Sequence, residues 1–222
     1  MDHPFAPYLV QLLVGLGVTL KIALGSFALG LVLSTVCVPL LASRFKMARR
    51  VLGALVAVLR GLPELLIIFM IFYGGTVLLT QLSGSYFEVN ALMAGIIALA
   101  TVAFAYNLEI LRSALGSIPA GQWEAATMLG LSPVQAFLRV IMPQMFRTAL
   151  PALGNQWLIT LKESALVSII GLEELMRKSV VAAGSTHEPL FFYLAAALLY
   201  ILVTGVSGLL LGRLNRHLSP AA

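Results

Sequence analysis

Three ionisable side chains lie inside or beside very apolar stretches of this 222-residue sequence: Glu64, Lys162 and Glu163. An ionisable group at membrane depth costs at least about 2.5 to 3.5 kcal/mol on insertion scales, so each needs a partner or a water-filled cavity. Lys162 and Glu163 are neighbours and point about 100° apart on a helix, so one can bind a ligand while the other fixes a helix contact. Ser164 and the backbone beside it can meet an α-carboxylate or an α-amine. This pattern indicates that the protein binds a charged, polar ligand along a path through its apolar part.

The residues just before Glu64 leave its role open. Pro63 ends the run Gly61-Leu62-Pro63, and a proline breaks the backbone hydrogen-bond ladder, which predicts a kink or a short discontinuity. Glu64 can therefore be a carboxylate at a helix start, stabilised by the helix dipole and paired with Arg60. It can equally face a polar pathway and meet a cationic side chain. Both interpretations stand on the residues alone.

Other polar residues in apolar stretches have structural explanations. Glu109 and Arg112 are spaced i, i+3 and share one helix face, which predicts a structural ion pair. Asn155, Gln156 and Trp157 are typical of side chains that cross-link membrane helices. We expect no ligand role for either group.

No group of residues indicates an enzyme active site or a metal site. The three histidines are dispersed, and the chain has a single cysteine. A phosphate-binding P-loop needs a glycine directly before its lysine. The four lysines instead follow Leu20, Phe45, Leu161 and Arg177. We therefore expect no metal, no bound cofactor and no ATP hydrolysis by this chain through that motif.

The composition indicates an all-α polytopic membrane protein. Apolar residues make up 60% of the chain and charged residues only 10%. The net charge of +5 does not indicate nucleic-acid binding, because the basic residues lie mostly in short loops beside apolar stretches. At about twenty residues per membrane helix, the length allows about five or six spans.

The apolar stretches predict five spans within one domain, 1–222, whose core is 9–217. The expected spans are 9–41, 64–81, 91–117, 145–170 and 190–211, and 171–189 is expected outside, with a short surface helix. The predicted cytoplasmic side holds most of the basic residues: Arg44, Lys46, Arg49, Arg50, Arg139, Arg147, Arg213 and Arg216. The outer side holds only Arg177 and Lys178. By the positive-inside rule, the N-terminus lies outside and the C-terminus inside.

The polar segment 118–143 interrupts this apolar pattern between the third and fourth spans. Its first part, 123–129, reads as a short helix that ends at Gly130 in the left-handed conformation. Ser132 then restarts a helix as its N-cap, with Pro133 at the first position and Gln135 completing a capping box. We expect two short helices that form a compact knob outside the bilayer.

The same segment resembles the EAA loop of ABC importer permeases. Glu124-Ala125-Ala126 is followed by Gly130 and by Pro143 at the spacing of that loop, although Val140 and Met142 replace the commoner Ile and Leu. Further runs resemble those of polar amino acid permeases of the histidine/arginine type: Arg60-Gly61-Leu62-Pro63-Glu64, Ala105-Tyr106 with Glu109 and Arg112, Leu150 to Trp157, and Lys162 to Leu166. Together they cover about 51–179.

The resemblance implies the translocation-pathway subunit of an ATP-driven importer in the bacterial inner membrane. Its substrate would be a polar, basic amino acid: arginine, histidine, lysine, ornithine or an opine-like derivative. The implied partners are an ATPase dimer that binds ATP and Mg, a second permease (itself or a similar one), an external substrate-binding protein and membrane lipid, with no nucleic acid.

The charges at membrane depth predict a substrate pathway lined by Glu64, Lys162, Glu163 and Ser164, and the resemblance adds a role for the knob. Contact with the ATPase would come from the knob, through Trp123, Glu124, Ala125, Ala126 and Gly130. The alternative function is an ion-coupled secondary amino acid transporter, but such folds usually contain internal repeats, and the two halves of this sequence show no convincing match.

Overall fold

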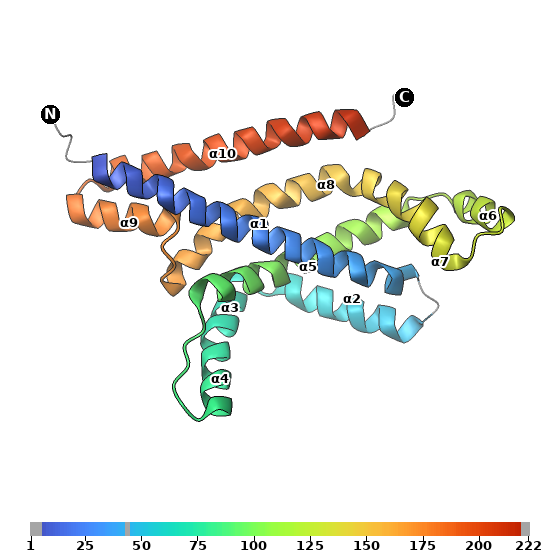
Figure 1. Ribbon diagram of the computed structural model, residues 1–222, viewed down its shortest axis with the longest axis horizontal. Helices are drawn as coiled ribbons and strands as arrows, with labels where there is room; N and C mark the ends of the chain where they lie inside the picture. Colours follow the sequence, from blue (N-terminus) through green and yellow to red (C-terminus); the bar gives the residue numbers. More distant parts are fainter. Residues whose placement is uncertain (1–5, 43–44, 219–222) are drawn as a thin grey trace.

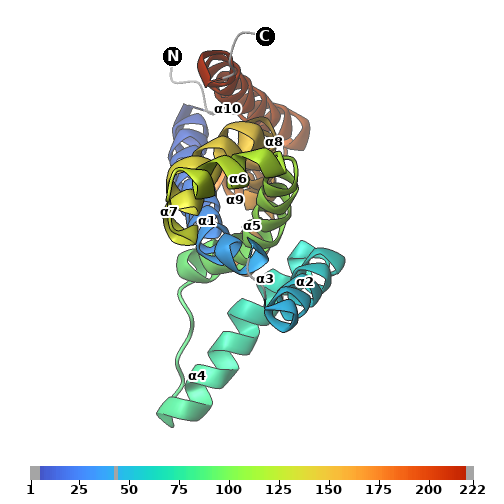
Figure 2. The same ribbon diagram turned by 90° about the vertical axis from the view of Figure 1, so that its right-hand side faces the viewer.

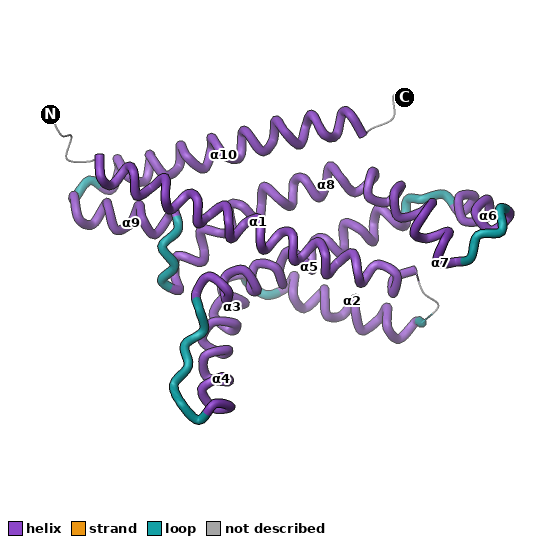
Figure 3. The backbone as a smooth tube through the Cα atoms, viewed as in Figure 1, coloured by secondary structure: helices purple, strands orange, loops and turns teal. Residues whose placement is uncertain are grey.

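The computed structural model describes residues 6–42 and 45–218, and the described chain is helical with short connections and no strand (Figure 3). Four long helices run along the long axis of the molecule (Figure 1): α1 (Ala6–Ala42), α5 (Ala91–Gly116), α8 (Met142–Glu163) and α10 (Pro189–Leu218). Helix α5 packs against both α1 and α8, while α10 packs on α8 and α9. This confirms the all-α architecture expected from the sequence.

Helix α2 (Lys46–Gly61) lies beside α5, and the chain then turns sharply (Figure 1). Beyond the turn, α3 (Glu64–Phe69), a π-helical turn (Met70–Gly74) and α4 (Gly75–Ser83) follow one another without interruption. This unit leaves the bundle at a steep angle in both views (Figures 1 and 2), and α4 has no buried residue. Its apolar surface is therefore free to meet lipid or another subunit.

Four described helices are long and apolar enough to cross a membrane: Pro7–Ala42, Glu64–Ser83, Ala91–Gly116 and Pro189–Arg216. They match four of the five predicted spans. The fourth predicted span, 145–170, is α8 followed by a 3-10 segment, Ser164–Ile170. It is not among the four because it carries several polar and charged residues: Arg147, Asn155, Gln156, Lys162 and Glu163. The five-span count and the orientation of the termini remain predictions.

Glycines in α1 set how closely its neighbours approach. A Cβ placed on Gly30 would lie 2.8 Å from the Cβ of Ala103 and 2.8 Å from the backbone nitrogen of Phe104, both in α5. A Cβ on Gly15 would lie 3.0 Å from backbone atoms of Leu175. Side chains larger than hydrogen would separate these backbones, which is how small residues act in membrane helix packing.

Helix α9 (Leu175–Thr186) differs from the surface helix expected in the outer segment. It packs against α1 and α10, and its buried face consists of Leu175, Ser179, Ala182 and Ala183. Phe192 at the start of α10 is fully buried in the same cluster. Helix α9 is therefore packed into the helix bundle.

Candidate functional site

The break between α2 and α3 is built by Pro63. Leu62 has extended backbone angles, and Pro63 stands as the N-cap of α3, with its carbonyl accepting from the Leu66 and Ile67 amides at 2.9 and 3.3 Å. Glu64 is consequently the first residue of α3, where a carboxylate is favoured by the helix dipole. Its side chain is half-buried. The discontinuity predicted from the sequence is confirmed.

The end of α8 lies against this break. Helix α3 contacts the 3-10 segment that follows α8. Glu163 is half-buried and is the last residue of α8, directly before that segment, and its neighbour Lys162 is exposed. Two acidic groups from sites 99 residues apart in sequence and one exposed lysine therefore gather where the helix geometry changes.

Ser164 is part of the same turn but faces inward. Its side chain is fully buried, and its hydroxyl donates to the carbonyl of Leu161 at 2.7 Å. This hydrogen bond therefore stabilises the turn at the end of α8. Among the four predicted pathway residues, Ser164 is the one whose side chain is fully enclosed.

A cavity of about 360 Å³ opens between α2, α5 and α8. Arg60 and Tyr106 line it, with the guanidinium carbon of Arg60 5.2 Å from the centre of the Tyr106 ring. Glu109 lines it as well, and its Oε2 lies 3.6 Å from Nη1 of Arg112 in an exposed i, i+3 pair. The cavity thus brings two of the sequence motifs onto one surface.

Some buried polar atoms in α5 and α8 have no hydrogen-bond partner in the described part of the chain. They belong to Asn107, Gln156 and Thr160, each at least 96% buried. For Gln156, the expected cross-link between helices is not formed through its side-chain nitrogen. Asn107 and Thr160 were not singled out from the sequence, because a lone polar residue in an apolar helix carries no spacing signal.

The segment 118–143 forms the predicted knob at the far end of the molecule (Figure 1). Helix α6 (Ala120–Met128) ends before Gly130, which has φ of +73°. Helix α7 (Pro133–Ala136) starts with the predicted capping box: the Ser132 amide donates to Gln135 Oε1 at 3.0 Å, and the Gln135 amide donates to Ser132 Oγ at 3.4 Å. Both local predictions are confirmed.

Side-chain contacts hold the two parts of the knob together and join its inner side to α8. The rings of Trp123 and Phe137 stack with centroids 6.5 Å apart, and Gln144 Nε2 donates to Gln122 Oε1 at 3.0 Å. Ala126 is the buried residue of α6.

The outer side of the knob is different in character. Glu124 and Ala125 are exposed, and so are the large apolar side chains of Met128 and Leu129, at 90% and 79%. An exposed apolar surface around a carboxylate is typical of a docking surface for another protein.

A buried polar cluster that the sequence did not predict joins α1, α9 and α10. Glu174, expected in an outer loop, is fully buried as the N-cap of α9, and its carboxylate accepts from the Met176 and Arg177 amides. It also accepts from Thr19 Oγ1 at 3.1 Å and from the Tyr200 hydroxyl at 3.3 Å. The only sequence signal was an acidic residue just before an apolar helix.

The acidic neighbour of this cluster is in a different environment. Glu173 is 71% exposed and pairs with Lys178. The hydrogen bond from the Lys178 ammonium holds the pKa of Glu173 below its usual value. Two adjacent glutamates therefore differ in their environment: Glu174 is buried in the cluster, and Glu173 is exposed in a surface ion pair.

The comparisons with known proteins agree with this architecture. Residues 27–221 match the family described as "Binding-protein-dependent transport system inner membrane component". The arginine ABC transporter permease protein ArtQ of Haemophilus influenzae is 40% identical over 203 residues, covering 91% of each chain. The histidine/lysine/arginine/ornithine permease HisQ of Salmonella typhimurium is 35% identical, covering 99% of this chain and 96% of HisQ.

Solved structures show the same fold. One chain from an amino acid ABC transporter with histidines aligns with a TM-score of 0.84 at 31% identity, over 98% of this chain and all of that one. A chain of the MetNI methionine ABC transporter aligns with a TM-score of 0.80 at 21% identity, over 99% of this chain and all of that one, which shows the shared fold. The chain is a multi-pass protein of the bacterial inner membrane, and it belongs to the family of inner membrane components of binding-protein-dependent transport systems.

Proposed function

We propose that this chain is the translocation-pathway subunit of an ATP-driven importer for basic amino acids. The observation that carries the substrate class is the placement of Glu64 at the start of α3 and Glu163 at the end of α8, next to the 3-10 segment that α3 contacts. Two carboxylates in one place stay ionised at low cost when a cation lies between or beside them. A guanidinium, ammonium or imidazolium side chain supplies that charge.

The relatives support this substrate class. Besides ArtQ and HisQ, the nopaline transport permease NocQ of Agrobacterium fabrum is 37% identical over 199 residues, covering 87% of this chain and 84% of NocQ. Arginine is in the names of both ArtQ and HisQ, and the name of HisQ adds histidine, lysine and ornithine. We extend that class to this chain because its own acidic residues fit it.

The proposed pathway assigns a separate task to each remaining residue. Lys162, exposed beside Glu163, meets the α-carboxylate of the amino acid. At Ser164 the backbone rather than the side chain meets the substrate, because the hydroxyl donates to the Leu161 carbonyl. Glu109 and Arg112 pair with each other and take no direct part.

The knob 118–143 is the proposed contact with the ATPase. Glu124, Ala125 and the exposed apolar residues of α6 would meet a dimer of ATPase subunits, which binds ATP and Mg. Trp123, Ala126 and Gly130 would hold the knob in the shape that transmits movement to α8. A second permease, itself or a similar one, and an external binding protein complete the importer.

The test is reconstitution of the chain with its ATPase, second permease and binding protein in proteoliposomes. We expect uptake of labelled arginine that requires ATP inside and that excess lysine or histidine reduces, while glutamate does not. A complex whose ATPase cannot hydrolyse ATP serves as the matched control. Arginine uptake by the chain alone, driven by a proton gradient, would instead establish the secondary-transporter alternative. ATP-driven uptake that glutamate inhibits as well as lysine does would reject the basic substrate class.

A further inference from the structure

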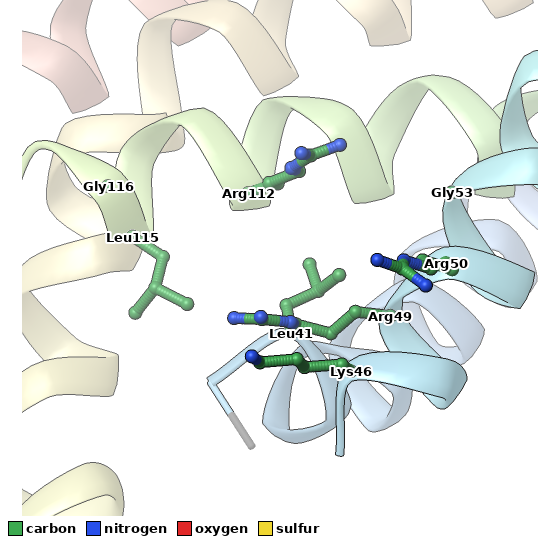
Figure 4. Close-up of a pocket in the computed structure, with 8 residues that line it drawn as sticks. All are labelled: Leu41, Lys46, Arg49, Arg50, Gly53, Arg112, Leu115 and Gly116. Atoms are coloured by element: carbon green, nitrogen blue, oxygen red, sulfur yellow. The ribbon is translucent and has the colours of Figure 1, made fainter. Parts of the chain in front are cut away.

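A cavity of about 680 Å³ lies away from the candidate pathway, between the end of α1, the first turn of α2 and the last turns of α5. Four cationic side chains line it (Figure 4), together with small and apolar residues: Lys46, Arg49, Arg50, Arg112, Leu41, Gly53, Leu115 and Gly116. In the close-up, Lys46 and Arg49 extend from α2 into the space between α2 and α5. The proposed function places none of these residues in the substrate pathway or in the contact with the ATPase.

The charges in this cavity are not balanced within the described chain. Arg112 pairs with Glu109. For Lys46, Arg49 and Arg50, no carboxylate of residues 6–42 or 45–218 lies within ion-pair distance. The first turn of α2 also contains no acidic residue. Like charges around one cavity repel, so an anion bound there relieves the repulsion.

The surface of α2 beside the cavity is apolar and exposed. Met47, Val51 and Val58 follow one another along one helix face and are 73%, 59% and 60% exposed. Leu52 and Val56 are buried on the opposite side of α2. The basic first turn lies between these two faces at the end of the helix. An occupant with a negative head and an apolar body matches both the charge and the neighbouring surface.

We propose that this cavity binds the phosphate headgroup of an anionic phospholipid, with the acyl chains lying along the exposed face of α2. The basic cavity stands at the predicted cytoplasmic ends of its helices, where phospholipid headgroups are located, and such pockets suit phosphate-bearing lipids. Arg49 and Arg50 supply planar donors that match phosphate oxygens, and Lys46 adds a third charge. A soluble phosphate would use the cavity but not the apolar face.

The test uses the full-length chain in its assembled complex, purified in neutral detergent and titrated with dioleoyl phosphatidylglycerol. Native mass spectrometry measures the fraction with bound lipid. Each cation near an anionic headgroup contributes about a fivefold factor, so Arg49→Gln/Arg50→Gln should weaken binding by roughly twenty-five-fold. The control Arg213→Gln/Arg216→Gln removes two exposed arginines at the end of α10, outside the cavity, and should bind as the unmodified chain does.

Two further variants and two further ligands make the result decisive. Arg49→Lys/Arg50→Lys keeps the charge that directs membrane insertion and should keep most of the binding, provided that the complex assembles. If Arg49→Gln/Arg50→Gln and Arg213→Gln/Arg216→Gln lose lipid binding equally, the proposal is overturned, because any basic residues at this end of the molecule would then attract the lipid. Equal binding of dioleoyl phosphatidylcholine, or of glycerol phosphate without acyl chains, would overturn it too, because the first needs no anionic site and the second no apolar face.

Discussion

The guanidinium carbon of Arg60 lies 5.2 Å from the centre of the Tyr106 ring, so the end of α2 is joined to the middle of α5. Both residues line the cavity between α2, α5 and α8. A cation over an aromatic face contributes about 0.5 to 2 kcal/mol, more when water is excluded. Since Glu64 follows Arg60 by only four residues, this contact also fixes the position of the break at Pro63.

Tyr106→Leu should therefore disturb transport while Tyr106→Phe should not. Leucine removes the ring face that holds Arg60, and phenylalanine keeps it. We expect the leucine variant to lower kcat/KM for arginine uptake by roughly two- to thirtyfold in proteoliposomes. If the leucine and phenylalanine variants transport equally well, the contact has no part in positioning the break.

Glu64→Gln should impair uptake of basic amino acids and leave complex assembly and basal ATPase activity intact. The substitution keeps the shape of the side chain and removes its charge. A charge-assisted hydrogen bond is worth about 1.5 to 3 kcal/mol, so its loss should weaken substrate occupancy by roughly ten- to hundredfold. The measurement is uptake of labelled arginine, lysine and histidine over a range of concentrations.

Glu88→Gln is the matched control, because Glu88 is exposed in the segment between α4 and α5. Its uptake should equal that of the unmodified complex. Normal uptake of all three amino acids by assembled Glu64→Gln complexes would favour the helix-start interpretation of Glu64. Selectivity would then lie in the external binding protein or around Lys162 and Glu163.

The features that the sequence predicted well depend on a few adjacent residues. Pro63 has no backbone N–H to donate and disfavours helical angles at Leu62, and Gly130 adopts positive φ at low steric cost. The Ser132–Gln135 capping box likewise needs only four residues. Such local features follow from backbone sterics and short hydrogen bonds, so they can be read without knowing how the helices pack.

The features that the sequence did not predict depend on contacts between distant segments. Glu174 resembles its neighbour Glu173 in sequence, and only the packing of α1 and α10 makes one buried and the other exposed. The proximity of Glu64 and Glu163 has the same origin. The hydropathy pattern also did not predict the angle at which α3 and α4 leave the bundle, because a helix has the same apolar pattern at any angle to its neighbours.

Gly130→Val should uncouple ATP hydrolysis from uptake. At φ of +73° a β-branched residue is strained by about 1 to 3 kcal/mol, although a Cβ there meets no atom within 4 Å. The strain should therefore change the angle between α6 and α7 rather than break a contact. The measurement is substrate-stimulated ATPase activity together with uptake. Gly121→Val is the control, since Gly121 lies inside α6 with equally open space; coupling that stays intact in both variants would rule out the role of the Gly130 turn.

Glu174→Ala should destabilise the chain far more than Glu173→Ala. The first removes the acceptor of four hydrogen bonds: those from the Met176 and Arg177 amides, from the half-buried Tyr200 hydroxyl and from Thr19, which keeps the Gly15 carbonyl as an acceptor. Leaving a buried donor unsatisfied costs about 1 to 3 kcal/mol, whereas an exposed ion pair is worth about 0 to 1 kcal/mol. Thermal unfolding in detergent measures the difference, and equal melting temperatures would show that the buried cluster does not stabilise the bundle.

The N-terminus should be accessible from outside the membrane and the C-terminus only from inside. Eight basic residues lie on the predicted inner side and two on the outer side, an asymmetry that orients membrane helices. The test places single cysteines at Asp2 and Ser219, which lie outside the described residues, in a Cys37→Ala background. A membrane-impermeant maleimide added to intact cells should label Asp2→Cys and not Ser219→Cys, while opened membranes, the control for reactivity, should allow labelling of both. Labelling of both positions in intact cells would require an even number of spans and overturn the five-span prediction. Labelling of Ser219→Cys alone would invert the orientation.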